Sequence, residues 1–175
     1  MASSSSSSSS SSTQAKKITL KAADGKHFEV EESVAMEMET LKSFFVGNED
    51  ATKDMVVPLL NVSSEHMPAI LDFYRNHLEF RKRTPPPPAE EVKAFNDAFL
   101  ENNSNEQLLE MIMAANFLNT KELLNFLTEA AANRIKNKSV EYVRAFFGIE
   151  SDFTPEEEAR IRAENDWAFD GLDED

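Results

Sequence analysis

The chain has 175 residues, of which 41% are hydrophobic, and this suits one domain with a real core and a tail or linker. Its formal net charge of −14 argues against broad nucleic-acid binding and against anionic membrane surfaces, because both need clustered lysine and arginine. The absence of cysteine excludes disulfides and zinc–thiolate sites and fits a reducing compartment. No apolar run reaches membrane-span length, and the N-terminus does not have the pattern of a secretory signal. Together with the net charge, these features lead us to expect neither nucleic acid nor membrane as a partner.

The first fifteen residues contain an unbroken run of serines from Ser3 to Ser12. A serine run cannot bury apolar surface or hold one conformation, so we expect residues 1–15 to form a disordered tail. Its hydroxyls offer phosphate acceptors, but a flexible solubilising extension is the simpler interpretation.

Residues 16–80 are expected to form the first part of the folded domain, and they begin with strand periodicity. Apolar residues alternate with polar ones in two short segments, at Ile18 and Leu20 and again at Phe28 and Val30. Between them Gly25 accepts the positive φ of a tight turn. The pattern predicts an N-terminal β-hairpin.

Three further elements follow in this part of the chain. We expect a short helix from Met36 to Phe45, and then a strand over residues 55–62 in which Pro58 favours a sheet edge. A longer helix, capped by Ser63 or Ser64, is predicted from Glu65 to Glu79 on its apolar spacing.

Residues 81–90 interrupt the helical pattern with the sequence RKRTPPPPAE. Four successive prolines cannot continue a helix and favour an extended polyproline segment, so this is predicted to be an exposed loop or linker. Arg81, Lys82 and Arg83 form the one compact basic cluster of the sequence. A solvated loop edge is favoured over part of a nuclear localisation signal, for which three residues are weak support.

The C-terminal half is helical by its pattern. Residues 91–138 include a helix from Glu106 to Leu118 that is apolar almost all round, so Met111 and Met113 are both expected in the core. Thr120 is expected to cap the next helix, which has one apolar face. Strands early and helices late define an α+β domain, with helices on one side and end of a small sheet.

Residues 139–175 begin with a short helix that Ser139 caps and Gly148 stops, and at least one of Phe146 and Phe147 is expected to close the core. The next helix has a capping box at Thr154 and Glu157, with Pro155 in its first position.

This last helix lacks the apolar stripe that would bury it on its own domain. Ala159, Ala163 and Trp167 make one narrow strip, and Ile161 lies on another side. Such a helix needs a partner, and tryptophan is enriched among the residues that dominate binding at interfaces.

No catalytic site can be assembled from the sequence. His27, His66 and His77 have no second ligand at metal spacing, and no G-x-S-x-G motif, cysteine nucleophile or phosphate-binding glycine loop is present. The acidic run Glu156–Glu158 lacks the alternating ligands and turn glycine of a calcium loop. We therefore expect no enzyme, no metal and no cofactor.

Several segments resemble the S-phase kinase-associated (Skp-type) adaptor proteins, in particular the plant-type members. These segments are LKAADGKHFEVEESVA, VPLLNVSSEHMPAILDF, FNDAFLE, LLEMIMAANFLNTKELLNFLTEAAANRIKN and IESDFTPEEEARIRAENDWAFD. The resemblance covers Lys17 to Asp170 and implies a BTB/POZ-type small sheet flanked by helices, with a C-terminal helical extension. Residues 16–80 and 91–138 then make the BTB/POZ part, and residues 139–175 make F-box-binding helices.

The resemblance also implies a function. It is that of a non-catalytic adaptor that links a cullin scaffold to interchangeable F-box substrate receptors in an SCF-type ubiquitin ligase, in nucleus and cytoplasm, and so supports protein ubiquitination and degradation. The family's cullin-facing pair falls on Asn116 and Phe117. Its F-box-facing apolar positions fall on Leu109, Leu124, Ile149, Phe153, Ile161 and Trp167.

The sequence departs from the family's pattern at several places. Phe117 stands where an aromatic residue with a hydroxyl is usual, Leu60 interrupts a Leu-Pro-Asn-Val pattern, and the proline-rich loop replaces an acidic one. These departures keep a second hypothesis open, in which the chain is a BTB-like interaction scaffold that acts outside the ubiquitin system without a cullin.

Overall fold

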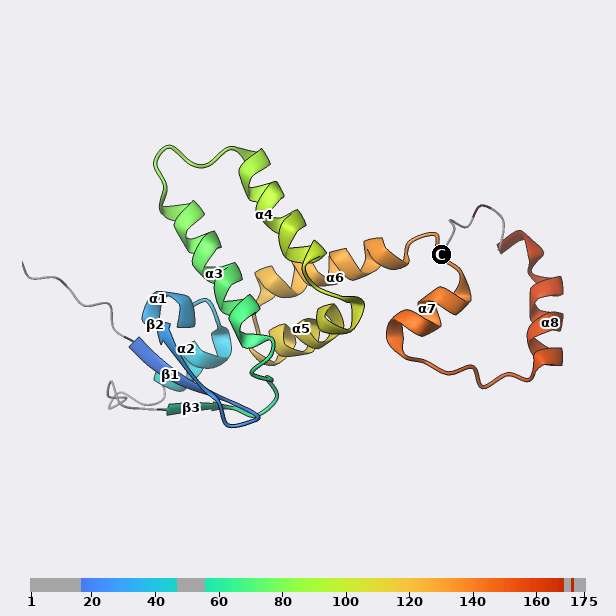
Figure 1. The fold of residues 1–175 in the computed structure, drawn as a ribbon, viewed down its shortest axis with the longest axis horizontal. Helices are drawn as coiled ribbons and strands as arrows, with labels where there is room; N and C mark the ends of the chain where they lie inside the picture. The colour runs from blue at the N-terminus through green and yellow to red at the C-terminus, as the bar shows by residue number, and fades with distance from the viewer. Residues whose placement is uncertain (1–16, 47–55, 169–170, 172–175) are drawn as a thin grey trace, which may run out of the picture.

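The computed structural model describes residues 17–46, 56–168 and 171, so the tail expected for residues 1–15 lies outside the described part. Figure 1 shows a small sheet with short helices at one end of the molecule and α7 and α8 at the other. The elements are β1 (Lys17–Ala22), β2 (His27–Glu31), α1 (Glu32–Ala35), α2 (Glu39–Val46), β3 (Val56–Leu59), α3 (Met67–Lys82), α4 (Ala89–Glu101), α5 (Asn105–Phe117), α6 (Lys121–Ile135), α7 (Val140–Phe147), α8 (Pro155–Glu164) and the 3-10 turn η1 (Asp166–Ala168).

The predicted hairpin is confirmed as the antiparallel pair β1–β2, in which Ile18 lies opposite Val30. Gly25 has a φ of 88° in the turn, which is the conformation that required glycine there. β3 pairs in parallel with the other side of β1, so the strand order is β2-β1-β3 and Pro58 lies on an edge strand, as predicted.

The first two helical predictions need correction. The helix expected from Met36 to Phe45 corresponds to α2, which begins three residues later at Glu39, and the four-residue α1 before it was not predicted. Neither Ser63 nor Ser64 caps α3, which begins at Met67 with a proline in its first turn. Instead Ser64 donates a hydrogen bond to Asp24, and this bond lowers the pKa of the Asp24 carboxyl. The serine therefore joins the hairpin turn to the segment before α3.

An aromatic cluster joins α3, α4 and α6. The ring of Phe73 stacks on the rings of His77 and Phe126, with distances between ring centroids of 4.1 Å and 5.5 Å. It meets the ring of Phe99 edge-on, with a centroid distance of 5.5 Å. α4 is a full helix of 13 residues that begins directly after the four prolines. The loop between α3 and α4 is consequently residues 83–88.

Arg134 connects the end of α4 to the start of α5. Its guanidinium donates to the backbone oxygens of Leu100 at 2.6 Å and Asn103 at 3.0 Å, and to the side chain of Asn105 at 2.8 Å. These bonds give the carbonyl groups at the end of α4 an additional donor, because the Leu100 oxygen already accepts from the Asn103 N–H at 3.3 Å. Ser104 and Gln107 complete a capping box at the start of α5 that sequence reasoning missed.

α5 and α6 form an antiparallel pair joined by residues 118–120. Met111 is fully buried in α5 as expected, but Met113 is 69% exposed, so its prediction as a core residue was wrong. Thr120 does occupy the N-cap position of α6, yet its hydroxyl donates to the backbone oxygen of Ala115 rather than capping the helix. No helix in residues 17–46 and 56–168 has the length and apolarity to cross a membrane.

Candidate partner-binding surfaces

The C-terminal arm, defined here as residues 139–168, begins with α7 packed against α5 and α6. Ser139 accepts a hydrogen bond from the Tyr142 N–H at 3.0 Å, which confirms the predicted cap. Gly148 ends the helix with a φ of 64°, and the Ile149 N–H reaches the Arg144 carbonyl at 2.8 Å, a Schellman-type stop. Phe146 is buried, so the prediction that one of the two phenylalanines closes the core is confirmed.

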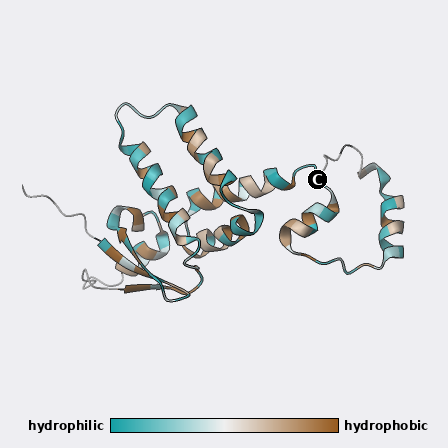
Figure 2. Ribbon diagram, viewed as in Figure 1, coloured by the Kyte–Doolittle hydropathy of each residue, from teal (hydrophilic) through white to brown (hydrophobic). Residues whose placement is uncertain are grey.

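α8 has the predicted capping box and no buried residue. The Glu157 N–H donates to Thr154 Oγ1 at 3.3 Å, and the Thr154 N–H donates to Glu157 Oε2 at 3.0 Å. The latter bond is the main reason that the pKa of Glu157 lies below its ordinary value. Figure 2 shows α8 as mostly hydrophilic. The helix ends at Glu164, so Trp167 does not continue a helical strip with Ala159 and Ala163 but lies in the 3-10 turn η1.

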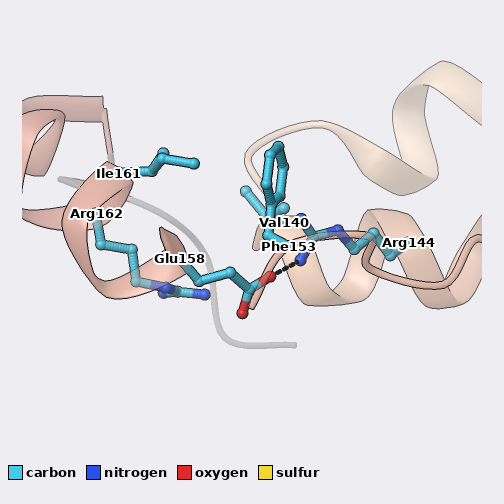
Figure 3. Close-up of a pocket in the computed structure, with 6 residues that line it drawn as sticks. All are labelled: Val140, Arg144, Phe153, Glu158, Ile161 and Arg162. Carbon is cyan, nitrogen blue, oxygen red and sulfur yellow. Dashed lines mark hydrogen bonds and ion pairs between the residues drawn. The ribbon is translucent and has the colours of Figure 1, made fainter. Parts of the chain in front are cut away.

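A small pocket separates α7 from α8 (Figure 3). It is lined by Val140, Arg144, Phe153, Glu158, Ile161 and Arg162, and its volume is about 60 Å³. Small-molecule sites have several hundred Å³, so this pocket suits part of one apolar side chain and not a substrate.

Ion pairs hold α8 to α7 around this pocket. Arg144 Nη1 lies 2.5 Å from Glu158 Oε1, which also accepts from Ser151 Oγ at 2.7 Å. The Ser151 bond and then the Arg144 guanidinium lower the pKa of the Glu158 carboxyl. Arg162 of α8 pairs with Glu141 of α7. The arm is thus joined mainly by polar contacts, and its apolar side chains stay available.

Large apolar side chains of the arm remain exposed to solvent. Trp167 is 76% exposed, Ile149 59% and Phe153 47%, while Ile161 is half-buried against the pocket. Clustered exposed apolar residues mark interaction surfaces on soluble proteins. Sequence reasoning assigned no role to Val140 and left Phe147 undecided, and both are about 40% exposed on α7. The spacing of apolar residues within this short helix was the available signal for them.

The two remaining predicted F-box positions lie on the body of the domain. Leu109 and Leu124 are half-buried against the core. Leu109 is near the start of α5, and α5 packs against α7. Leu124 is in the first turn of α6, at the end of that helix opposite to α7. The structure therefore does not bring Leu124 together with the arm residues.

Asn116 and Phe117 lie at the C-terminal end of α5, next to α2. Asn116 is exposed and Phe117 is half-buried. The Thr40 hydroxyl of α2 donates to the Phe117 carbonyl at 2.8 Å, so the backbone of this surface is fixed. Met113 precedes Asn116 by three residues and shares its helix face, which extends the patch. Met113 stands three and four residues before Asn116 and Phe117, and this helical spacing was the available signal for it. The signal was weak, because α5 is apolar on most sides.

The described residues contain no group of three or more histidine, cysteine, aspartate or glutamate side chains able to hold a metal ion. Two histidines instead have structural contacts: His66 pairs with Glu110, and His77 stacks on Phe73 and lies 3.2 Å from Glu122.

The three-stranded sheet with its helices and the C-terminal arm define an α+β, POZ-type fold with a helical extension. Residues 16–79 match the tetramerisation domain of the Skp1 family, and residues 121–168 match the dimerisation domain of the same family. The chain belongs to the Skp1 family. This finding confirms the resemblance to plant Skp-type proteins that the sequence motifs indicated, together with the expected fold class.

Relatives from two plants agree with this assignment. The chain is 39% identical over 161 residues to SKP1-like protein 1A of Arabidopsis thaliana, and the match covers 89% of this chain and 98% of that protein. It is 36% identical over 155 residues to SKP1-like protein 14 of Arabidopsis thaliana, with the same coverage of both chains. It is 37% identical over 168 residues to SKP1-like protein 20 of Oryza sativa subsp. japonica, covering 87% of this chain and 94% of that protein.

Proposed function

We propose that this protein is a non-catalytic adaptor that links a cullin scaffold to F-box substrate receptors in an SCF-type E3 ubiquitin ligase. The observation that carries the proposal is the C-terminal arm. Its last helix buries no residue of its own, and the segments on either side of that helix display Phe153 and Trp167 to solvent. A helix so exposed gains stability from a partner, and membership of the Skp1 family supports an F-box as that partner.

On the F-box side, the arm supplies apolar contacts and the pocket between α7 and α8. Ile149, Phe153 and Trp167 offer apolar area to the F-box, and the pocket beside Ile161 accepts one of its side chains. Large aromatic residues at the centre of an interface carry most of its binding energy. Leu109, near the start of α5, extends this surface onto the body, whereas Leu124 lies at the end of α6 away from α7 and is not assigned to it.

On the cullin side, the end of α5 supplies the contact. Asn116 offers a polar side chain, Phe117 a ring and Met113 a flexible apolar one. This patch lies at the opposite end of the α5–α6 pair from α7. α6 has 15 residues and is therefore about 22 Å long, so both partners can bind at once. Ubiquitin transfer then depends on how the adaptor places the receptor relative to the scaffold, with no chemistry of its own.

The test is affinity purification of the full chain from cells that express it. A cullin and F-box proteins together are expected in the eluate, and localisation to both nucleus and cytoplasm is expected by microscopy. A Trp167→Ala variant should lose the F-box proteins and keep the cullin. If the wild-type chain captures F-box proteins and no cullin, the ligase role is wrong.

That last outcome would favour the second candidate, an interaction scaffold outside the ubiquitin system. Two features support keeping it. Phe117 has no hydroxyl to hydrogen-bond a cullin, and Leu60, at the break in the family's pattern, is 74% exposed.

A further inference from the structure

The loop between α3 and α4, residues 83–88, carries a motif that the proposed function does not use. Its sequence is RTPPPP, and Pro87 is half-buried while the other five residues are exposed. Figure 1 shows the loop projecting from the ends of α3 and α4, away from both the sheet and the arm. Four prolines that bury little of their own domain are not explained by packing.

The last three prolines of this loop, which follow the cis Thr84–Pro85 peptide bond, favour the polyproline II conformation. Arg83 has φ −69° and ψ 136°, and Pro88 has φ −55° and ψ 146°, both in the polyproline II region. Pro86 and Pro87 each precede another proline, and this disfavours the helical value of ψ for both. Since a polyproline II helix has three residues per turn, Pro86–Pro88 are placed to form about one turn, in which Pro86 and Pro88 are exposed and Pro87 is half-buried.

Basic side chains adjoin the prolines in a chain that is otherwise strongly acidic. Arg81, Lys82 and Arg83 each make an ion pair with a glutamate of the same domain. This pairing leaves less positive charge for a nuclear localisation signal. The pairs are Arg81–Glu37, Lys82–Glu79 and Arg83–Glu91. All three cations are about half exposed or more. Exposed ion pairs are weak, so a carboxylate of a partner can replace Glu91 at Arg83 at little cost.

We propose that the loop is a docking site for a proline-recognition domain with an aromatic-lined groove, of the SH3 type, and that Arg83 meets a carboxylate beside that groove. Such grooves bind polyproline II segments because the conformation is already formed and little chain entropy is lost. Here α3 and α4 also fix both ends of the loop. The site gives the protein a third partner, at a place distinct from the α5 end and from the arm.

The test uses the full chain and a ¹⁵N-labelled SH3 domain that selects basic, proline-rich ligands. Saturable shifts of the groove's aromatic residues are expected. The double substitution Pro86→Ala, Pro87→Ala should weaken binding about ten-fold or more. Pro68→Ala, which changes an exposed proline in the first turn of α3, is the matched control and should bind as wild type does. Thermal melts of all variants check that the fold is kept.

Two charge variants test the role assigned to Arg83. Arg83→Ala should weaken binding and reduce its dependence on salt, because one exposed ion pair with the partner is lost. Glu91→Ala should strengthen binding, because it frees Arg83. The proposal is overturned if the groove residues do not shift, if the double proline variant binds like wild type, or if an F-box peptide displaces the SH3 domain.

Discussion

The α5–α6 layer and the C-terminal arm use similar apolar residues in opposite ways. In the layer, Leu108, Leu123 and Leu127 are fully buried, and Arg134 donates to the carbonyl groups at a helix junction. In the arm, α8 has no buried residue, and Arg144 forms an ion pair with the partly exposed Glu158. Buried apolar contacts therefore stabilise α5 and α6, whereas α8 is held in place mainly by ion pairs at the surface.

The difference separates two tasks that an adaptor must perform. The α5 end is fixed by Thr40 and by core contacts of Phe117, which suits a constant partner. The arm keeps most of its apolar area for a partner that can be exchanged, since little of it is used in folding. Substitutions should accordingly affect global stability in the layer and binding in the arm.

The largest expected effect is a loss of global stability on Leu127→Ala. Leu127 is fully buried, and truncation of such a leucine costs about 3 kcal/mol through lost transfer energy and the cavity left behind. Ile149→Ala, at a 59% exposed position of the arm, should change stability by no more than about 0.5 kcal/mol. Urea unfolding of the two variants measures this. Equal losses would show that the arm is part of the core.

Trp167→Ala should give the next effect, on binding. Loss of the exposed indole is expected to weaken F-box binding by about 2 kcal/mol, as for other large aromatic residues at interfaces. Global stability should not change, because the side chain is 76% exposed. Calorimetric titration with an F-box peptide measures the affinity, and unchanged affinity would contradict the role of the arm.

Phe117→Lys should impair cullin binding about ten-fold or more while F-box binding is kept. Because Phe117 is half-buried, a thermal melt must show that the variant folds. Phe117→Tyr is the second variant: it keeps the ring, adds a hydroxyl and should bind the cullin at least as tightly as wild type. Simultaneous loss of both partners in a folded Phe117→Lys variant would refute the assignment of two separate surfaces.

Much of the fold follows from local sequence physics. The alternation of Ile18, Leu20, Phe28 and Val30 predicted the hairpin, and Ser139 and Thr154 predicted two helix starts. Errors arose where tertiary contacts decide: Ser64 bonds to Asp24 of a distant turn instead of capping α3. Arg134 of α6 binds the junction between α4 and α5, which lies some thirty residues earlier in the sequence. No local pattern reveals such a contact.

The candidate site shows the same division. Sequence physics alone identified the partnerless last helix and Trp167, because both are local properties. It could not place Met113 at the surface, since a helix apolar on most sides does not show which side faces solvent. Nor could it separate Leu124 from the arm, because that depends on which end of α6 meets α7.

Hydrogen exchange should distinguish the two regions directly. The amides of α8 are expected to exchange fast in the free protein, because its helix has no buried residue and is held by exposed ion pairs. The amides of α5 and α6 should be strongly protected in the same sample. Addition of an F-box peptide should slow exchange across residues 149–168. Equal protection of α8 with and without the peptide would show that the arm is already rigid.

The smallest expected effect concerns the acid titration of Glu158. Its pKa is lowered from 4.5 by the Ser151 hydroxyl and then by Arg144, so the contact between α7 and α8 is complete above pH 4.5 and is lost as pH falls through the lowered value. Ser151→Ala should raise this pKa toward 4.5, and Arg144→Gln should raise it too. Glu157 is the internal control, because its pKa is lowered by Thr154 and should not respond to either change. A ¹³C titration of both carboxyl groups measures this. An unmoved Glu158 pKa would mean that Ser151 and Arg144 do not hold α8 in solution, and α8 would then owe its position to the Arg162–Glu141 pair and to the apolar contacts around the pocket.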